Sequence, residues 1–196
     1  MTIVVGIAGG SASGKSTLAR ALAESLTERL KQVETLAMDR YVREDRAAGP
    51  HFVSPMTGER LFDWNHPDAY DLGRLLADVA VRASAQDAPD VLLVEGLMAL
   101  HFPDLRRRFA LLLFLDLDAD VRALRRLLRD MAGGRASRDP EFIARYYLEC
   151  ARVGHARFVE PSRAHADLVL RGDADFTRLT PLLCAAVEEC QSRTAL

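Results

Sequence analysis

Residues 3–17 read IVVGIAGGSASGKST, and in this stretch an apolar, β-branched run leads directly into a glycine-rich segment. Gly9, Gly14, Lys15 and Ser16 fill the fixed positions of the pattern G-x4-G-K-[ST], which lies between a strand and a helix in phosphate-binding loops. Glycine lets the backbone curl until successive N–H groups point inward, and the helix that follows adds its positive N-terminal dipole. The stretch therefore predicts a loop that binds the phosphates of a nucleoside triphosphate.

The residue types in this loop match separate tasks. Lys15 is long enough to reach the β- and γ-phosphates, and the Ser16 hydroxyl is placed to ligate the Mg²⁺ that bridges them. A glycine-rich turn that binds nothing is the alternative, but the strand before the loop and the helical pattern after it argue against this. The residues predicted to contact the nucleotide are Gly9, Gly10, Ser11, Ala12, Ser13, Gly14, Lys15, Ser16 and Thr17.

Composition predicts a single domain, residues 1–196, with a substantial apolar core. The chain has 196 residues, of which 49% are hydrophobic, and its net charge of −2 gives no electrostatic case for a nucleic-acid or membrane partner. No apolar run approaches about 18 residues, and the first residues lack the pattern of a secretion signal. The three cysteines show no metal-binding spacing and are expected to be reduced thiols, so a cytoplasmic protein is predicted.

Segments typical of strands and helices alternate along the chain. Leu18, Ala21, Leu22 and Leu26 recur at helical spacing directly after the loop, and continuous apolar runs typical of buried strands lie further on. The later strands are expected at 33–38, 91–96, 109–116 and 166–170. The later helices are expected at 67–85, 120–131, 140–158 and 176–190. This alternation predicts an α/β fold in which helices cover both faces of an open parallel sheet.

Two acidic residues follow predicted strands. Asp39 comes directly after the strand expected at 33–38, and Glu95 lies near the end of the run 91–96. Ligands of parallel α/β sheets bind at the carboxyl ends of strands, and an acid there beside a phosphate loop commonly contacts Mg²⁺ or holds water. The alternatives are that Asp39 only caps a turn and that Glu95 only terminates its strand. Their place beside the loop favours a functional role for both.

Residues 40–66 form a long connection with little periodicity. They carry Tyr41, Phe52, Phe62 and Trp64, and this aromatic content favours a segment that covers a substrate over a disordered one. Aromatic side chains in an exposed loop also serve to pin the loop to the core, and both interpretations stay open.

Arginines recur through the helix expected at 120–131 and just beyond it. Such a run is commonly a solvated helix face, and that alternative stays open for Arg122 and Arg125. A glycine pair at 133–134 provides a flexible joint, and arginines on a mobile lid stabilise the charge of a phosphoryl-transfer transition state. The lid is expected at about 130–140. The arginines that bear on it are Arg126, Arg129, Arg135 and Arg138.

Further motifs are spread along the chain: MDRY at 38–41, HPDA at 66–69, VEG at 94–96, RRLLRD at 125–130, FVEPS at 158–162 and AD at 166–167. With GIAGGSASGKS at 6–16 they make the sequence similar to the uridine kinase and phosphoribulokinase group of phosphate-loop kinases, and closest to uridine kinases, over nearly its whole length. The resemblance implies a P-loop NTPase fold with a five-stranded parallel sheet and an arginine-bearing lid. It also implies transfer of phosphate from ATP-Mg²⁺ to a hydroxyl of a small metabolite.

The resemblance assigns roles to particular residues. It implies that Asp39 is the general base toward the acceptor hydroxyl, and that Ser16, Asp39 and Glu95 surround the metal. Arg126 and Arg129 match lid residues that touch the substrate side and the phosphates. The acceptor implied is a nucleoside or a similar hydroxyl compound, and relatives of this kind often form homo-oligomers.

The acceptor side departs from the pattern of uridine kinases. Asn65 stands where they carry an acid that holds the ribose hydroxyls, and its amide can bind a diol but lacks the charge. Val42 replaces a second aromatic residue, and residues 82–90 are too few for the hairpin that contacts the pyrimidine. In the lid, two arginines that flank a glycine are replaced by a single Arg135 after the glycine, with Arg138 as a candidate for the other role.

The sequence predicts an ATP-dependent kinase of a small alcohol, with the 5′-hydroxyl of uridine or cytidine as the leading acceptor. A shortened base-binding region also suits another acceptor, such as nicotinamide riboside. The other class is a nucleotide-binding regulatory module that hydrolyses ATP slowly, and the acids argue against it because a switch needs no acceptor base. The predicted acceptor residues are Asp39, Tyr41, Trp64, Asn65, His66, Arg126 and Arg138.

Overall fold

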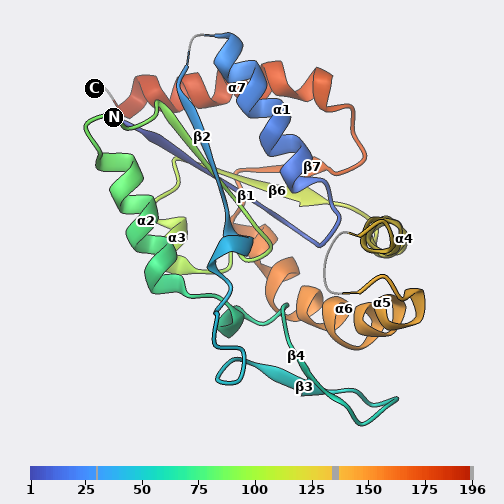
Figure 1. Ribbon diagram of the computed structural model, residues 1–196. Coiled ribbons are helices and arrows are strands. Elements are labelled where there is room, and N and C mark those ends of the chain that lie inside the picture. Colours follow the sequence, from blue (N-terminus) through green and yellow to red (C-terminus); the bar gives the residue numbers. More distant parts are fainter. Residues whose placement is uncertain (30, 134–136, 195–196) are drawn as a thin grey trace.

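The computed structural model describes residues 1–29, 31–133 and 137–194. Its main sheet has five parallel strands in the order β2-β5-β1-β6-β7 (Figure 1), which confirms the sheet expected from the sequence. Because β1 lies at the centre, the loop that follows it opens at the middle of the carboxyl edge. The strands are β1 (Ile3–Gly9), β2 (Val33–Ala37), β5 (Val91–Glu95), β6 (Leu111–Asp116) and β7 (Leu168–Arg171).

Helices cover both faces of this sheet (Figure 1). Ile3, Val5 and Ile7 of β1 share a core with α1 and α7, whereas Val4 and Ala8 share the opposite core with α2. A strand that is buried on both faces needs apolar side chains at successive positions, which explains the continuous run at the start of the sequence. The helices of these layers are α1 (Lys15–Glu28), α7 (Phe176–Thr194), α2 (Leu72–Ser84) and α3 (Pro103–Arg106).

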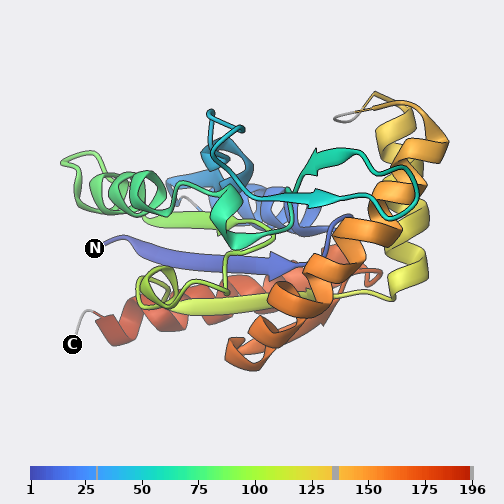
Figure 2. The same cartoon turned by 90° about the horizontal axis from the view of Figure 1, so that it is seen from below.

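A third group of helices stands beyond the carboxyl end of β1 (Figure 2). It contains α4 (Ala119–Met131) and α5 (Pro140–Tyr146), which pack against each other. The helix expected at 140–158 is present, but its hydrogen bonding changes along its length. The stretches Tyr147–Ala151 and His155–Val159 are π-helical, with α6 (Arg152–Gly154) between them, and a 3₁₀ stretch (Glu160–His165) follows. Single π-helical turns within helices frequently occur at functional sites.

The helix expected at 67–85 begins later than predicted. Pro67–Ala69 form a separate 3₁₀ turn, and α2 starts only at Leu72. The start is fixed by Asp71, whose Oδ1 accepts a hydrogen bond of 3.0 Å from the backbone N–H of Arg74. Such an N-cap satisfies one of the donors that a helix start leaves without a partner.

The connection 40–66 contains secondary structure that its lack of periodicity did not predict. A 3₁₀ turn (Met38–Tyr41) follows β2, and β3 (His51–Val53) pairs antiparallel with β4 (Arg60–Phe62) in a hairpin. Strands of three residues are too short to show a clear alternation. The hairpin tip contacts the helical group, because the backbone N–H of Met56 donates to Glu149 Oε1 at 3.3 Å.

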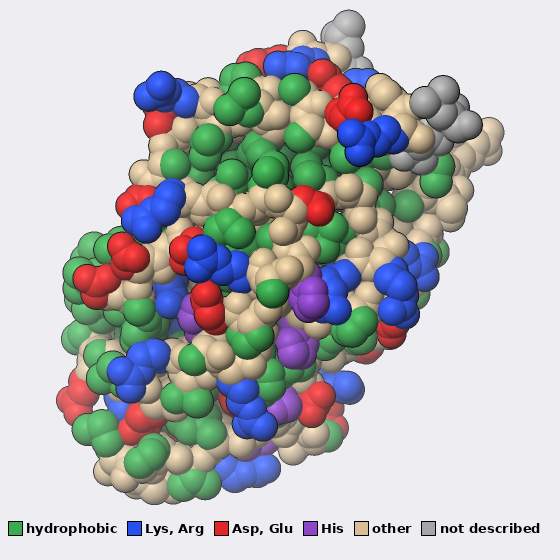
Figure 3. Space-filling model, turned by 180° about the vertical axis from the view of Figure 1, so that it is seen from behind, with side chains coloured by type: hydrophobic (Ala, Val, Ile, Leu, Met, Phe, Trp, Pro, Cys, Tyr) green, Lys and Arg blue, Asp and Glu red, His purple; other side chains and the backbone are tan. Residues whose placement is uncertain are grey.

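Charged side chains of both signs are mixed on the face opposite to the view of Figure 1 (Figure 3). This mixture agrees with the net charge of −2 of the whole chain. In the part of the chain that the structure describes, no helix combines the length and the apolar character that crossing a membrane requires.

The turn after β7 lies directly against the loop after β1. Gly172 N donates to Asp116 O at 2.7 Å, which draws this turn onto the end of β6. A Cβ atom placed on Gly172 would lie 2.2 Å from Ser13 O and 3.2 Å from Leu117 Cβ. Because the first of these atoms belongs to the backbone, a side chain at position 172 would push the glycine-rich loop out of place.

We therefore expect Gly172→Ala to lower the free energy of unfolding by about 1–3 kcal/mol, the usual cost of overpacking. The measurement is urea unfolding followed by circular dichroism. Gly73→Ala is the matched control, because a Cβ there meets only Asp71 Oδ1 at 3.6 Å. That variant should be stabilised by roughly 0.5–1 kcal/mol, as usual when alanine replaces glycine in a helix. Equal stability of the two variants would contradict the proposed backbone contact.

Candidate active site

The loop between β1 and α1 adopts the curled backbone that its sequence predicts. Gly9, Ala12 and Gly14 have φ angles of 145°, 62° and 102°, which lie in the region that favours glycine. Gly14 is the N-cap of α1, and no side chain caps the helix. A helix start without a side-chain cap offers its N–H groups to an anion.

The polar side chains at the start of α1 point to two different places. Lys15 Nζ donates to Gly10 O at 2.9 Å, so the ammonium group lies over the loop. Ser16 Oγ donates to Glu95 Oε1 at 2.9 Å, and Glu95 is the last residue of β5. A hydroxyl beside a carboxylate is a pair of hard oxygen donors, which suits Mg²⁺.

The described residues contain no group of three or more His, Cys, Asp or Glu side chains that could enclose a metal. This agrees with the way Mg²⁺ is usually bound beside phosphates, by one or two carboxylates together with the phosphate oxygens. The donor set of Ser16 and Glu95 therefore fits a magnesium ion that a nucleotide brings to the loop.

A cavity of about 880 Å³ extends from this loop to the helical group. It brings together residues that lie far apart in the sequence. Asp39, which follows β2, and Glu95, at the end of β5, line it together with residues of the loop. The Asp39 side chain is exposed. The predicted site residues in the lining are Ser11, Ala12, Gly14, Lys15, Ser16, Thr17, Asp39, Trp64, Asn65, Glu95, Arg126 and Arg129.

Three residues that were predicted to bind the acceptor, Tyr41, His66 and Arg138, lie outside this lining. Tyr41 is only 3% exposed, and its hydroxyl donates to Asp78 Oδ2 at 2.7 Å, so it belongs to the core. Burial, together with Asp78, raises the pKa of Tyr41 to about 12. The His66 ring packs edge-on against Phe158 at 4.9 Å between centroids. Its Nδ1 accepts a hydrogen bond from the backbone N–H of Asp68, and the predicted pocket roles of Tyr41 and His66 are therefore not supported.

The lid predictions have mixed outcomes. Arg135 lies outside the described residues. Arg138 is exposed and is not in the cavity lining, and a Cβ on Gly133 would lie 2.7 Å from Arg138 Nη2. This guanidinium therefore covers the backbone of the glycine, and its place does not support the predicted substrate contact.

Asp130 holds two arginines of α4 at the cavity wall. It is 4% exposed, and its Oδ1 accepts from Arg129 Nε at 2.8 Å while its Oδ2 lies 3.4 Å from Arg126 Nε. Arg126 also lies over the Tyr146 ring, 5.4 Å from the centroid, and burial lowers its pKa. A buried carboxylate that accepts a hydrogen bond from Arg129 and forms an ion pair with Arg126 holds both guanidinium groups in place before any ligand arrives.

Several lining residues were not identified from the sequence. Tyr146 accepts a hydrogen bond from Trp64 N and donates to Phe62 O, so it joins α5 to the segment 40–66. Burial raises its pKa. Arg125 donates to Gly172 O at 3.0 Å. The helical spacing of Phe142 and Tyr146 was a visible signal, but a core-facing helix shows the same spacing.

Asn65 is the residue whose place differs most from its expected role. It is 4% exposed, and its Nδ2 donates to Cys150 Sγ at 3.4 Å. The Cys150 thiol in turn donates to Asp63 Oδ1 at 3.0 Å. Burial raises the pKa of Cys150 to about 12, so the thiol remains neutral at physiological pH. This contact uses one of the two N–H donors of the Asn65 amide, which keeps a second N–H and its oxygen for other contacts.

Beneath the loop lie two side chains that the sequence did not place there. Arg122 is 5% exposed and its Nε donates to Leu117 O at 2.9 Å, so the interpretation as a solvated helix face is wrong for this residue. His155 Nε2 lies 3.3 Å from Glu160 Oε2. The pKa of His155 is lowered to about 4, first by burial and then by the positive charge of Arg122, with a smaller contribution from Lys15.

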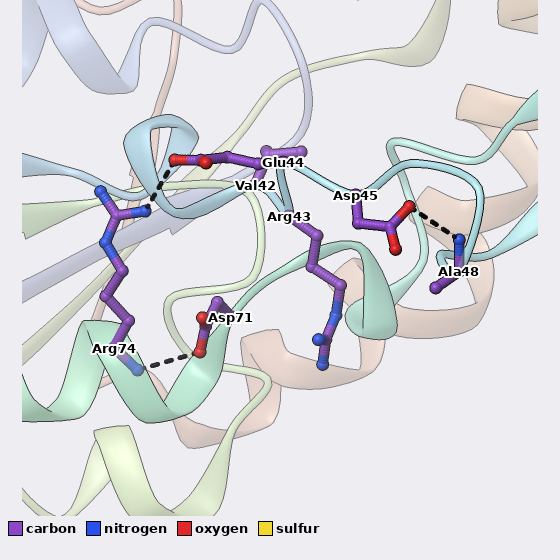
Figure 4. Close-up of a pocket in the computed structure, with 7 residues that line it drawn as sticks. All are labelled: Val42, Arg43, Glu44, Asp45, Ala48, Asp71 and Arg74. Carbon is purple, nitrogen blue, oxygen red and sulfur yellow. Dashed lines mark hydrogen bonds and ion pairs between the residues drawn. The ribbon is translucent and has the colours of Figure 1, made fainter.

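A second, smaller pocket of about 380 Å³ lies between the first part of the segment 40–66 and the start of α2 (Figure 4). Arg74 Nη1 lies 3.7 Å from Glu44 Oε1, and Asp45 Oδ1 accepts from Ala48 N at 3.3 Å. Arg43 Nε donates to Asp68 O at 2.8 Å. These charged side chains already have partners within the protein, and they hold the segment against α2.

Comparison with known proteins gives consistent results. A family model described as "Phosphoribulokinase / Uridine kinase family" matches residues 4–84 and 74–175. Uridine kinase from Chloroflexus aggregans (strain MD-66 / DSM 9485) is 34% identical over 192 positions, which cover 87% of each chain. Uridine kinase from Chloroflexus aurantiacus (strain ATCC 29366 / DSM 635 / J-10-fl) is 31% identical over 214 positions, which cover 98% of this chain and 97% of the relative.

A solved structure described as a "possible uridine kinase" from Bacillus stearothermophilus has a similar fold. It superposes with a TM-score of 0.58 over 86% of this chain and 88% of that chain. At 18% identity this likeness concerns the fold alone.

The buried imidazole predicts a pH dependence of stability. The pKa of His155 is about 4 in the folded chain and about 6.5 when unfolded, so the unfolded chain binds the extra proton between these values. Stability contributed by this site is complete above pH 6.5 and is lost as the pH falls toward 4, by up to about 3 kcal/mol. His155→Gln should flatten this part of the curve in urea unfolding at pH 4.5–7.5, relative to the exposed control His165→Gln. Identical curves for both variants would contradict the assignment.

Proposed function

Because the chain belongs to the phosphoribulokinase/uridine kinase family, we propose that it transfers the γ-phosphate of ATP to the 5′-hydroxyl of a pyrimidine nucleoside. One observation carries the proposal: the phosphate loop, two strand-end acids and an aromatic wall share a single cavity. A nucleotide-binding switch needs the loop but not an acid facing an acceptor. A kinase needs both, and family membership makes the chain a phosphotransferase.

Asp39 acts as the general base in this proposal. The acceptor oxygen attacks the γ-phosphorus, the bond from that phosphorus to the β,γ-bridging oxygen breaks, and the proton of the acceptor hydroxyl passes to the Asp39 carboxylate. Phosphoryl transfer through a loose transition state asks mainly for positioning and a hydrogen-bond acceptor, so an ordinary carboxylate is adequate. The place of Asp39 in the cavity, at the end of β2, supports this role.

Ser16, Glu95 and Asp39 would hold the magnesium ion. The hydrogen bond between Ser16 and Glu95 keeps their oxygens together at the mouth of the loop. When bound, Mg²⁺ neutralises charge on the β- and γ-phosphates. Lys15 and Arg129 contribute further positive charge from the two sides of the cavity, and Asp130 keeps Arg129 aimed.

The other end of the cavity supports an acceptor with a planar base. Arg46 lies over the Trp64 ring, 4.5 Å from its centroid, and Phe142 and Tyr146 line the same cavity. Stacked aromatic and guanidinium groups of this kind suit a flat ring system. The relatives named uridine kinase support a pyrimidine nucleoside, while the short stretch 82–90, which has too few residues for a base-contacting hairpin, keeps nicotinamide riboside as a second candidate.

Replacement of the proposed base tests the proton transfer. Asp39→Asn should reduce kcat by ~100-fold or more while ATP affinity is retained, because only the proton acceptor is lost. The measurement is coupled ADP release at saturating ATP and acceptor, with ATP binding followed separately by calorimetry. Asp87→Asn, an exposed acid between α2 and β5, is the control and should keep normal turnover. Near-normal turnover of Asp39→Asn would remove the assigned base.

The two lysines of the chain provide a matched pair. Lys15→Ala should abolish activity with every acceptor, because the triphosphate then binds weakly or in the wrong place. Lys31→Ala changes the same residue type away from the cavity and should leave ADP release unchanged. If both variants remain active, the loop does not hold the transferred phosphate.

The acceptor itself is identified by ADP release across uridine, cytidine, nicotinamide riboside and simple alcohols. Acceleration by a pyrimidine nucleoside supports the proposal. If no hydroxyl compound accelerates ATP consumption, and Asp39→Asn leaves slow hydrolysis unchanged, then the chain acts as a regulatory module instead.

A further inference from the structure

One face of α4 carries arginines at positions 122, 125, 126 and 129, which recur at helical spacing. Arg125, Arg126 and Arg129 line the cavity. The carbonyl oxygen of Gly172 accepts a hydrogen bond from Arg125, while Asp130 accepts one from Arg129 and forms an ion pair with Arg126. Arg122 differs from these because it lies outside the lining and is only 5% exposed. It is thus a buried cation at the base of the arginine-bearing helix.

The hydrogen-bond acceptor of Arg122 is a backbone carbonyl oxygen, which carries no net charge. Arg122 Nε donates to Leu117 O at 2.9 Å. Among residues 1–29, 31–133 and 137–194, no carboxylate lies within ion-pair distance of its guanidinium. A buried charge is costly unless an opposite charge compensates for it. In the part of the chain that the structure describes, the Arg122 guanidinium is thus buried without an ion pair.

This charge lies directly behind the phosphate loop. A Cβ on Gly10 would be 2.6 Å from Arg122 Nη1 and 2.8 Å from its Cδ, so the guanidinium covers the backbone of the loop. Glycine at position 10 is what permits this approach. Gly10 also contacts the ammonium group of Lys15, because Lys15 Nζ donates to Gly10 O.

The pKa of the neighbouring His155 imidazole is lowered in part by the same positive charge. His155 feels the charge of Arg122 and of Lys15, and both act with burial to lower its pKa, while Glu160 acts in the opposite direction. His155 Nδ1 is buried and has no hydrogen-bond partner among the described residues. This region therefore contains the positive charges of Arg122 and Lys15, a neutral imidazole and the partly exposed carboxylate of Glu160.

We propose that Arg122 is a positioning residue for the triphosphate, which holds the Gly10 turn from behind and supplies a buried positive charge that bound phosphates compensate. The inference rests on the proposed function only in that the loop binds nucleotide phosphates. It predicts that the effect of Arg122 grows with the number of phosphates in the ligand. A purely structural residue would affect all ligands of the loop alike.

The test is calorimetric binding of ATP and of AMP, each with Mg²⁺, to the wild-type chain and to Arg122→Gln, Arg122→Met and Arg122→Lys. The neutral variants should bind ATP roughly 10-fold more weakly or worse, as expected when one charge near the ligand is lost at an effective dielectric constant of about 20. Their AMP affinity should fall by less than ~3-fold. Arg122→Lys keeps the charge and should restore most of the ATP affinity.

Thermal unfolding without ligand identifies variants that fail to fold. Arg122→Gln and Arg122→Met fill the space differently, and one of them that folds is enough to test the loss of charge. Arg108→Gln removes an exposed charge at the amino end of β6 and should change neither affinity. Equal losses for ATP and AMP, or Arg122→Lys binding ATP no better than Arg122→Gln, would overturn the inference. Failure of the wild-type chain to bind ATP would instead refute the proposed function.

Discussion

The site depends on how closely the backbone of the phosphate loop packs against other backbone. A Cβ on Gly9 would lie 2.5 Å from Leu115 O, and one on Gly172 would lie 2.2 Å from Ser13 O. In these contacts the loop lies directly against the backbone at the end of β6 and in the turn after β7. A loop that is fixed in this way can present its N–H groups to phosphate without first being ordered, so little of the binding free energy is spent on ordering it.

The cavity lining shows which elements supply charged side chains around the loop. Its side chains come mainly from α1, from the turns after β2 and β5, from α4 and α5, and from the segment 40–66 and the turn that follows it. Acids therefore enter from strand ends, as Asp39 and Glu95 do, and cations enter mainly from helices, as Lys15 and Arg129 do. Cations outnumber carboxylates in the lining, which suits a ligand with net negative charge.

Much of this arrangement was predictable from the sequence because its causes are local. The continuous apolar runs predicted the buried strands, and the spacing of Gly9, Gly14 and Lys15 predicted the loop. The acid after β2 was predictable from the rule that parallel strands present their carboxyl ends to the ligand. The expected five-stranded parallel sheet is the observed one.

What the sequence did not predict depends on contacts between distant segments. The hairpin at 51–62 has strands too short to show periodicity. Tyr41 and His66 follow motifs of the family, but Asp78 and Phe158 draw them away from the cavity. The burial of Arg122 requires the loop beside it to be already in place, and no pattern along a single helix reveals that.

Contacts between distant segments also limit which residue can stand at position 65, where the acceptor is expected to bind. Asp63 Oδ1 already accepts from Asn65 N and from the Cys150 thiol, in a place where Asn65 is 4% exposed. An acid at position 65 would bring a second carboxylate beside Asp63, and like charges in a buried place cannot both ionise without cost. An amide avoids this repulsion and satisfies the Cys150 sulfur as well. The packing between the helical stretch that follows α5 and the segment 40–66 thus accounts for asparagine here, and it leaves the acceptor an amide group and aromatic faces rather than a carboxylate.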